Sequence, residues 1–195
     1  IVTQTTTLLT HREQWEAICQ DSGLIPAAVT EAMRFEPGIA GLVRVTREDI
    51  ELDGGTVPAG QLVILSILSA LRDERVFRNP DAFDIHRPDQ PQPHLAFGSG
   101  PHRCLAEALA RVELEESLAV LTNRLPGLRL VDPPYFKDLV APCLKTLTGG
   151  NWLDPDALIV VETDAKESFE HDGFDIVDTR EAGKARLTML KLASI

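Results

Sequence analysis

Cysteine is scarce in this chain of 195 residues: there are three, Cys19, Cys104 and Cys143. An odd and widely spaced set does not make a disulfide framework, and no C-x-x-C pattern indicates a structural metal site. The scarcity therefore excludes a small secreted domain held by disulfides. A reducing cytoplasm is the expected location.

Long apolar runs and an excess of positive charge are also missing. The longest aliphatic-rich run, Leu62 to Leu68, is far too short to span a bilayer, and we expect no secretory leader. Lys and Arg number 19 against 30 Asp and Glu, which gives a formal net charge of −11. This balance argues against a nucleic-acid partner and against an anionic membrane, so we expect neither. The hydrophobic content of 44% is that of a globular protein of one ordinary or two small domains.

Apolar spacing predicts two helices at the start of the chain. The first covers residues 7–20, where apolar side chains recur at helical intervals. The second begins after Gly23, with Pro26 in its first turn, and ends before Pro37. It carries Glu31-Ala32-Met33-Arg34, whose spacing places the acid and the base on one helical face. By itself this is a solvated surface pair of little energetic worth.

Strand-like alternation follows the helices. Residues 42–57 alternate apolar and polar side chains around Gly54-Gly55, which predicts a hairpin, and an apolar strand follows at residues 62–67. Residues 72–93 are rich in proline and charge and predict an irregular segment that still buries some apolar side chains.

The stretch FGSGPHRC, residues 97–104, leads into the clearest helix of the chain. Leu105, Leu109 and Val112 are expected on one packed face of that helix, which continues towards Pro126-Gly127. Gly98 and Gly100 allow the backbone to approach a planar surface closely. A thiol at a helix N-terminus meets free N–H groups that favour a thiolate, the form that binds iron. Cys104 is thus either an iron ligand or a small packed hydrophobe.

The resemblance to a known family decides between these alternatives. Phe97-x-x-Gly100-x-His102-x-Cys104 resembles the haem-binding signature of cytochrome P-450 monooxygenases. Three further features are similar in order and spacing: Glu31-x-x-Arg34 with Arg87 as a Glu-Arg-Arg triad, the hairpin that precedes Arg87, and Arg44 as an arginine that binds a haem propionate. The resemblance covers residues 1 to about 131.

The resemblance implies a haem b cofactor with its iron on Cys104. It implies that His102 and Arg44 meet the haem carboxylates, that Phe97, Gly98 and Gly100 border the haem, and that Glu31, Arg34 and Arg87 hold the scaffold. The implied reaction uses dioxygen and electrons from a ferredoxin-type or reductase donor to insert oxygen into a small organic substrate. The last motif position, usually glycine, is Ala106, and the family's oxygen-activating helix lies outside the resemblance.

Residues 132–195 have a different texture, with 12 acids and 7 bases. They open on Asp132-Pro133-Pro134-Tyr135, which is by itself a good turn. The sequence further predicts a helix over residues 137–147, a strand at 157–161 and a closing antiparallel pair. With GLRLVDPP, residues 127–134, as the strand that leads into Asp132-Pro133-Pro134-Tyr135, these form a β-α-β-β tail.

This tail resembles the C-terminal end of bacterial small-subunit ribosomal RNA guanine-N2 methyltransferases. In that family the DPPY carboxylate and a proline carbonyl hold the target amino group, and the aromatic ring stacks on the base. The resemblance implies S-adenosylmethionine as the alternative cofactor and Asp132, Pro133, Pro134 and Tyr135 as the alternative site. The expected fold class is therefore α+β: a mainly helical P-450 part, residues 1–131, joined to a Rossmann-like methyltransferase tail, residues 132–195. A third hypothesis is a non-catalytic remnant, in which two incomplete coding segments meet near residues 128–134.

Overall fold

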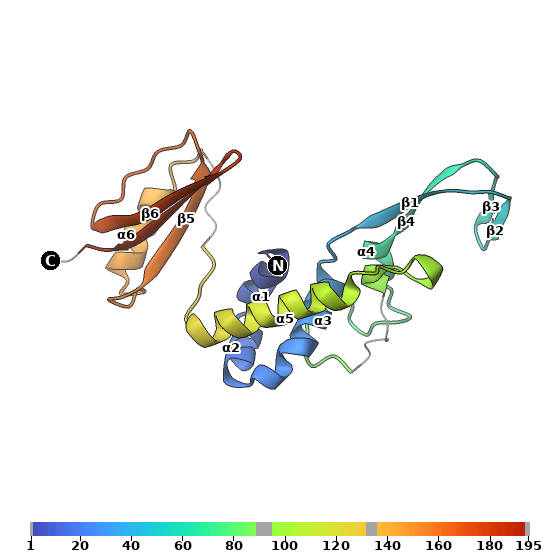
Figure 1. Cartoon of the computed structure of the whole chain (residues 1–195), viewed down its shortest axis with the longest axis horizontal. Helices are drawn as coiled ribbons and strands as arrows, with labels where there is room; N and C mark the ends of the chain where they lie inside the picture. The colour runs from blue at the N-terminus through green and yellow to red at the C-terminus, as the bar shows by residue number, and fades with distance from the viewer. Residues whose placement is uncertain (1, 89–94, 132–135, 194–195) are drawn as a thin grey trace. The chain divides into compact units, whose positions relative to one another are not determined.

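The computed structural model describes residues 2–88, 95–131 and 136–193. The chain divides into two compact units, Ile1–Leu130 and Val131–Ile195. This division falls one residue before the boundary expected from the sequence. Because the placement of one unit against the other is not determined, the two are described separately (Figure 1).

The first helical stretch is two helices, α1 (Val2–Thr10) and α2 (Arg12–Gln20), so the single helix expected over residues 7–20 is wrong. His11 lies between them with φ −106° and ψ 69°, outside the helical region. Its imidazole Nδ1 lies 2.8 Å from the carbonyl oxygen of Thr7, a bond to the backbone that competes with the helix. Apolar spacing cannot reveal this break, because both helices bury their apolar faces in the same core.

Helix α3 (Ile25–Phe35) lies where the sequence predicts it, with Pro26 in the first turn and Glu36 as the C-cap. It packs against α1 and α5, and every residue from Ala28 to Arg34 is buried. A helix that is enclosed in this way must place polar side chains inside the protein. The surrounding core consists of Leu8, Trp15, Ile18, Ile25, Ala28, Val29, Ala32, Met33, Phe83, Ile85, Leu114 and Leu118.

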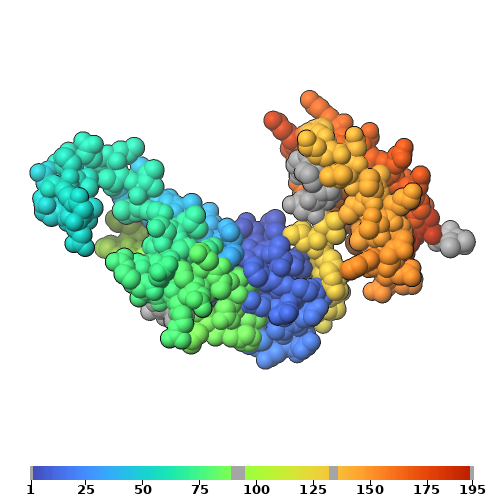
Figure 2. Space-filling model, turned by 180° about the vertical axis from the view of Figure 1, so that it is seen from behind, coloured from blue at the N-terminus to red at the C-terminus, as the bar shows by residue number. Residues whose placement is uncertain are grey.

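Four strands form an arm of two antiparallel ladders: β1 (Gly41–Val45), β2 (Ile50–Leu52), β3 (Gly55–Val57) and β4 (Leu62–Ser66). β2 pairs with β3, as the expected hairpin requires, but β1 pairs with β4 from Gly41↔Ser66 to Val45↔Leu62. The expected hairpin is therefore right at its tip and wrong at its base. Alternation assigns side chains to faces, whereas it does not select the partner strand. Figures 1 and 2 show the arm extending from the helices of this unit.

The strand expected over residues 62–67 ends one residue early, because Ile67 begins the short helix α4 (Ile67–Ala70). Residues 72–88 then form an irregular segment, as predicted. Ile67, Leu71 and Phe77 form a small second apolar cluster, and Phe83 and Ile85 belong to the larger core. Most of the apolar side chains of the segment are therefore buried, and their contacts hold the segment against the helices. Residues 89–94 lie outside the described part of the chain.

Helix α5 (Glu107–Arg124) differs from expectation at its start. Leu105, predicted on the packed face, precedes the helix and is 100% exposed, and Leu109 and Val112 are exposed as well. Burial begins at Leu114 and continues at Leu118. The prediction that this face is packed is wrong. Leu109 lies roughly 180° around the helix from Leu118, so α5 has apolar side chains on two faces, and periodicity does not tell which of them a neighbour covers.

The second unit places helix α6 (Val140–Gly149) beside a three-stranded sheet. The strands are β5 (Leu158–Asp164), β6 (Phe174–Ala182) and β7 (Ala185–Leu192). β7 lies between the other two and is antiparallel to both, so β5 and β6 are parallel to each other. The core of this unit consists of Val140, Leu144, Val161, Phe174 and Leu190.

The observed order of this tail is α-β-β-β, so the expected first strand is wrong. Residues 128–131 have no strand, because no other described segment pairs with them. The closing antiparallel pair is confirmed as β6 and β7. Among the described residues, no helix is long and apolar enough to cross a membrane.

Candidate haem-ligand site

The glycine-rich stretch forms a tight loop that presents Cys104. It consists of two short 3-10 turns, η2 (Leu95–Phe97) and η3 (Gly100–His102). Gly98 and Gly100 have φ of +76° and +73°, a region that residues with a side chain rarely adopt. The Cys104 N–H donates to the carbonyl oxygen of Phe97 at 3.0 Å and closes the loop. Cys104 is exposed and its thiol is free.

Cys104 precedes the first residue of α5 by three positions, with Ala106 as the N-cap. The carbonyl oxygen of Cys104 accepts the Glu107 N–H at 3.4 Å, so a single turn connects the thiol to the helix. Ala106 has φ −87° and ψ 9°, a conformation that needs no glycine. The backbone therefore accommodates alanine at the position where the resembling family usually has glycine.

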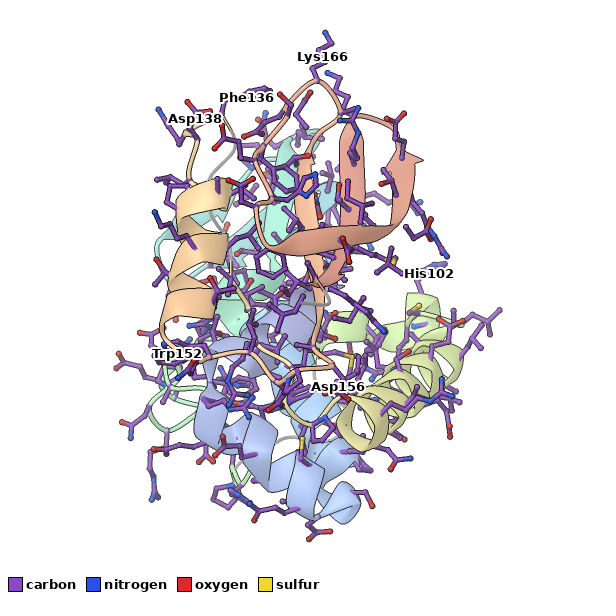
Figure 3. The ribbon with its side chains drawn as sticks, turned by 90° about the vertical axis from the view of Figure 1, so that its left-hand side faces the viewer. His102, Phe136, Asp138, Trp152, Asp156 and Lys166 are labelled. Carbon is purple, nitrogen blue, oxygen red and sulfur yellow. The ribbon has the colours of Figure 1, made fainter. Side chains whose placement is uncertain are left out.

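A cavity of about 430 Å³ opens at this loop. Cys104, His102, Phe97 and Gly98 line it from the loop, and Arg44 lines it from β1 (its lining also includes the apolar side chains of Met33, Leu42, Ile67 and Leu114). This volume lies in the range of roughly 300–1,000 Å³ that cofactor sites occupy. Gly100 shapes the loop without lining the cavity. Figure 3 shows His102 beside the start of α5.

Two of the side chains that line the cavity can hold an anion. The Arg44 guanidinium donates only to the carbonyl oxygen of its neighbour Val43, at 2.8 Å, and it has no carboxylate partner within the described residues. The imidazole of His102 has no hydrogen-bond partner in this part of the chain either. Glu113 of α5 is the acidic residue of the lining. Arg44 and His102 are thus available for a carboxylate.

The residues present fit a haem. The Cys104 thiol would hold the iron, the apolar side chains would pack against the macrocycle, and Arg44 with His102 would bind its carboxylates. The described residues contain no group of three His, Cys, Asp or Glu that could hold a metal ion by itself.

Glu31 and Arg34 of α3 meet Arg87 of the irregular segment in a buried ion cluster. Arg34 Nε and Nη2 donate to the two Glu31 carboxylate oxygens at 2.8 Å each, and Arg87 Nε donates to Glu31 Oε1 at 3.3 Å. The side chains of Arg34, Glu31 and Arg87 are 0%, 1% and 4% exposed. This burial rules out a solvated surface pair.

Backbone groups complete the coordination of the cluster. Arg34 also donates to the carbonyl oxygens of Leu71, Pro80 and Ala82, and Arg87 donates to those of Arg78, Asn79 and Ala82. Buried charges are tolerated when their hydrogen-bonding groups are satisfied in this way. The cluster therefore holds the irregular segment against α3. Its three residues do not line the cavity.

Sequence reasoning missed two side chains that position the same segment. Gln14 Nε2 donates to the Phe83 carbonyl oxygen at 2.6 Å, and its Oε1 accepts the Ile85 N–H at 2.8 Å. The Arg72 guanidinium lies 4.1 Å from the centre of the Phe35 ring. A glutamine on a polar helix face carries no sequence signal for such a role, because only the fold brings residue 14 to residues 83 and 85.

The alternative site, Asp132, Pro133, Pro134 and Tyr135, lies outside the described residues. Next to it, the Phe136 N–H donates to Glu167 Oε1 at 3.1 Å. Figure 3 shows Phe136, Asp138 and Lys166 at one end of the second unit and Trp152 and Asp156 at the other.

Two family models match the chain. The model described as cytochrome P450 matches residues 8–124, more than half of the chain, and a model described as conserved hypothetical protein 95 matches residues 108–191. The first match places the helical unit in the haem-thiolate class of proteins. The chain belongs to the cytochrome P450 family. The second match supports a methyltransferase-like tail.

Individual relatives match about two thirds of the chain. The plant-inducible cytochrome P450-pinF1 of Rhizobium radiobacter is 44% identical over 117 residues, which are 60% of this chain and 28% of the relative. Nocardicin C N-oxygenase of Nocardia uniformis is 46% identical over 129 residues, 65% of this chain and 32% of the relative. The P450 heme domain of Tepidiphilus thermophilus superposes with a TM-score of 0.64 at 37% identity, over 68% of this chain and 32% of that domain. The chain thus spans about a third of the length of these relatives.

Proposed function

We propose that the first unit is the haem-binding part of a bacterial cytochrome P450 monooxygenase, with Cys104 as the iron ligand. One observation carries the proposal: Cys104, His102 and Arg44, from segments up to sixty residues apart, line one cavity with apolar walls. Family membership supports haem as the group that this cavity takes.

Each residue of the loop has a separate task in this proposal. Cys104 holds the iron through its sulfur, while Arg44 and His102 hold the haem carboxylates by charge-assisted hydrogen bonds. Because Gly98 and Gly100 have no side chains, the backbone there can approach a flat ligand closely, and Phe97 packs beside that ligand. Glu31, Arg34 and Arg87 act through the scaffold, because their buried cluster points its hydrogen bonds at backbone carbonyls.

The proposed reaction inserts one oxygen atom of dioxygen into a small organic substrate. The other oxygen atom leaves as water, which consumes two protons and two electrons from a ferredoxin-type or reductase donor. The haem supplies the activation of dioxygen when it is bound. Relatives named as a 23-monooxygenase and an N-oxygenase support this reaction class. A cytoplasmic location suits the free cysteines.

A haem titration tests the ligand assignment. The chain is loaded with haem, reduced and exposed to carbon monoxide, and the absorption spectrum should be of the thiolate type. Cys104→Ser should abolish that spectrum. Cys19→Ser is the matched control, because Cys19 is a half-buried thiol of α2 outside the cavity, and it should leave the spectrum intact. A histidine-type or free-haem spectrum, or equal losses in both variants, would overturn the proposal.

A second candidate function concerns the tail. The match over residues 108–191 favours a ribosomal RNA guanine-N2 methyltransferase fragment that uses S-adenosylmethionine with Asp132, Pro133, Pro134 and Tyr135. Calorimetry with S-adenosylmethionine separates the candidates: saturable heat supports this function, and its absence at high ligand concentration retires it. If both ligand tests are negative, the non-catalytic remnant is favoured.

A further inference from the structure

Arg103, next to the proposed iron ligand, makes a two-pronged ion pair that the function above does not use. Its Nε donates to Glu107 Oε2 at 2.6 Å and its Nη2 donates to Glu107 Oε1 at 2.8 Å. Its remaining arm, Nη1, donates to the carbonyl oxygen of Gly98 at 2.8 Å. One guanidinium therefore joins the beginning of the loop to the first turn of α5.

The pair continues into the helical body. Arg111, one turn further along α5, donates from Nε to Glu107 Oε1 at 3.3 Å and from Nη1 to the hydroxyl of Thr30 at 3.1 Å. Its guanidinium also lies 5.6 Å from the centre of the Phe97 ring. The Arg103–Glu107–Arg111 network thus links the loop to α5 and, through Thr30, to α3.

The alternative is an ordinary surface ion pair along one helix, which contributes little to the stability of the fold. Two observations separate this network from that case. The side chains of Arg103, Glu107 and Arg111 are 23%, 20% and 20% exposed, so each is mostly covered. Two of the bonds also leave the helix, one to Gly98 and one to Thr30, and an isolated surface pair makes no such bonds.

We propose that Arg103 and Glu107 are positioning residues of the proposed haem-ligand loop. Two bonds hold the loop closed: Cys104 N–H to Phe97, and Arg103 Nη1 to Gly98. The second depends on Glu107, which fixes the guanidinium in the required orientation. Without the pair, the Gly98 carbonyl loses its donor and the Cys104 thiol is free to leave the cavity.

Amide hydrogen exchange of the ligand-free chain tests this directly. We expect exchange at the Cys104 N–H and the Gly98 N–H to rise about tenfold or more in Arg103→Gln and in Glu107→Gln, because a hydrogen bond to a charged group is lost. Arg75→Gln is the matched control: it removes a two-pronged pair with Asp73 in which the arginine is 88% exposed and makes no bond to the described loop residues, and it should leave both rates unchanged. Rates in the two loop variants equal to those of the control would overturn the proposal.

Two further variants keep the test sharp. Arg103→Lys keeps the charge and loses the planar fork, so it should give an intermediate exchange rate. In the double variant Arg103→Gln with Glu107→Gln, exchange should rise no further than in the single variants, because all three break one unit. A Lys variant like the wild type, or additive effects in the double variant, would contradict a shared positioning role.

A spectroscopic measurement separates positioning from general stability. In haem-loaded protein, Arg103→Gln should lower the fraction of the thiolate-type carbon monoxide spectrum, while its unfolding midpoint should stay near that of Arg75→Gln. An unchanged fraction would overturn the inference. This part rests on the proposed function. If the wild-type chain gives no thiolate spectrum, the proposed function fails, and the exchange rates still decide the role of Arg103 and Glu107.

Discussion

At the residue scale, two kinds of polar side chain are distinguished by how many of their hydrogen bonds are used. Arg44 and His102 line a cavity and are exposed, with almost no partners within the described residues. Glu31 and Arg34 are completely enclosed and bonded on every side. Unused bonding capacity suits groups that bind a ligand, whereas saturated capacity suits groups that hold the fold.

Removing one member of the buried cluster should be costly. Arg34→Met leaves Glu31 with a buried charge and only part of its partners, so we expect a loss of about 3–5 kcal/mol in the free energy of unfolding of the first unit. Denaturant unfolding followed by the fluorescence of Trp15, which is buried in this unit, measures the loss. Arg75→Gln, in an exposed pair, should leave it essentially unchanged, because solvent screens the interaction. Similar effects in both variants would contradict the cluster's structural role.

The exposed pair itself predicts a pH dependence. Hydrogen bonds from Arg75 lower the pKa of Asp73 to about 2. Because the folded-state pKa lies below the ordinary value of 3.8, the stabilisation is present above that value and is lost as the pH falls towards about 2. In Arg75→Gln the pKa of Asp73 should return towards its ordinary value, as an NMR titration of the carboxyl carbon would show. A pKa that stays near 2 in this variant would refute the assignment.

At the element scale, α5 shows how far apolar spacing predicts packing. Its later turns are buried at Leu114 and Leu118, while Leu109 is 60% exposed. Leu109 and Leu118 are nine residues apart, about two and a half turns, so they lie on opposite faces of the helix. Spacing alone does not tell which of the two leucine faces a neighbour covers. The difference arises because α2 and α3 pack against this helix, and this neighbourhood is a property of the fold.

This difference gives a paired prediction within one helix. Leu118→Ala should cost about 2–5 kcal/mol in the free energy of unfolding of the first unit, because it removes buried methyl groups and leaves a cavity. Leu109→Ala, the same substitution on the exposed turn, should change it by less than about 0.5 kcal/mol. Chemical denaturation measures both. Equal costs would mean that Leu109 is covered in solution.

At the scale of the whole molecule, each of the two units has a main core of its own among the described residues. The larger core contains residues from 8 to 118, and the core of the second unit contains residues from 140 to 190. No residue belongs to both cores. The boundary between the units lies after the end of α5, between Leu130 and Val131. Each unit therefore has its own buried apolar surface to lose on unfolding.

Separate cores predict separable unfolding transitions. Leu118→Ala should lower the denaturant midpoint of the first unit only, and Leu190→Ala, in the central strand β7, should lower that of the second. Hydrogen exchange with mass spectrometry at increasing denaturant resolves the two. A single transition that both substitutions shift equally would show that the units unfold together. A gradual change without any transition would instead favour the remnant hypothesis.

The organisation of the whole chain also bears on the hypothesis that two incomplete coding segments meet near residues 128–134. The chain covers about a third of its cytochrome P450 relatives, and a different family model matches residues 108–191. We expect a single uninterrupted reading frame when genomic DNA is amplified and read across these codons. Two separate genes, brought together only by misassembly, would refute a natural join.

The buried cluster and the choice of Cys104 as the iron ligand were expected from the family resemblance. The sequence by itself determined the loop and the helix boundaries at Pro26 and Pro126-Gly127. These are local properties, since glycine, proline and short motifs act within a few positions of themselves. The tertiary structure alone decided that β1 pairs with β4, that the start of α5 is exposed, that His11 breaks the first helix and that Arg103 clamps the loop. The physical reason is that partner choice and burial depend on contacts between residues far apart in the chain, which periodicity does not encode.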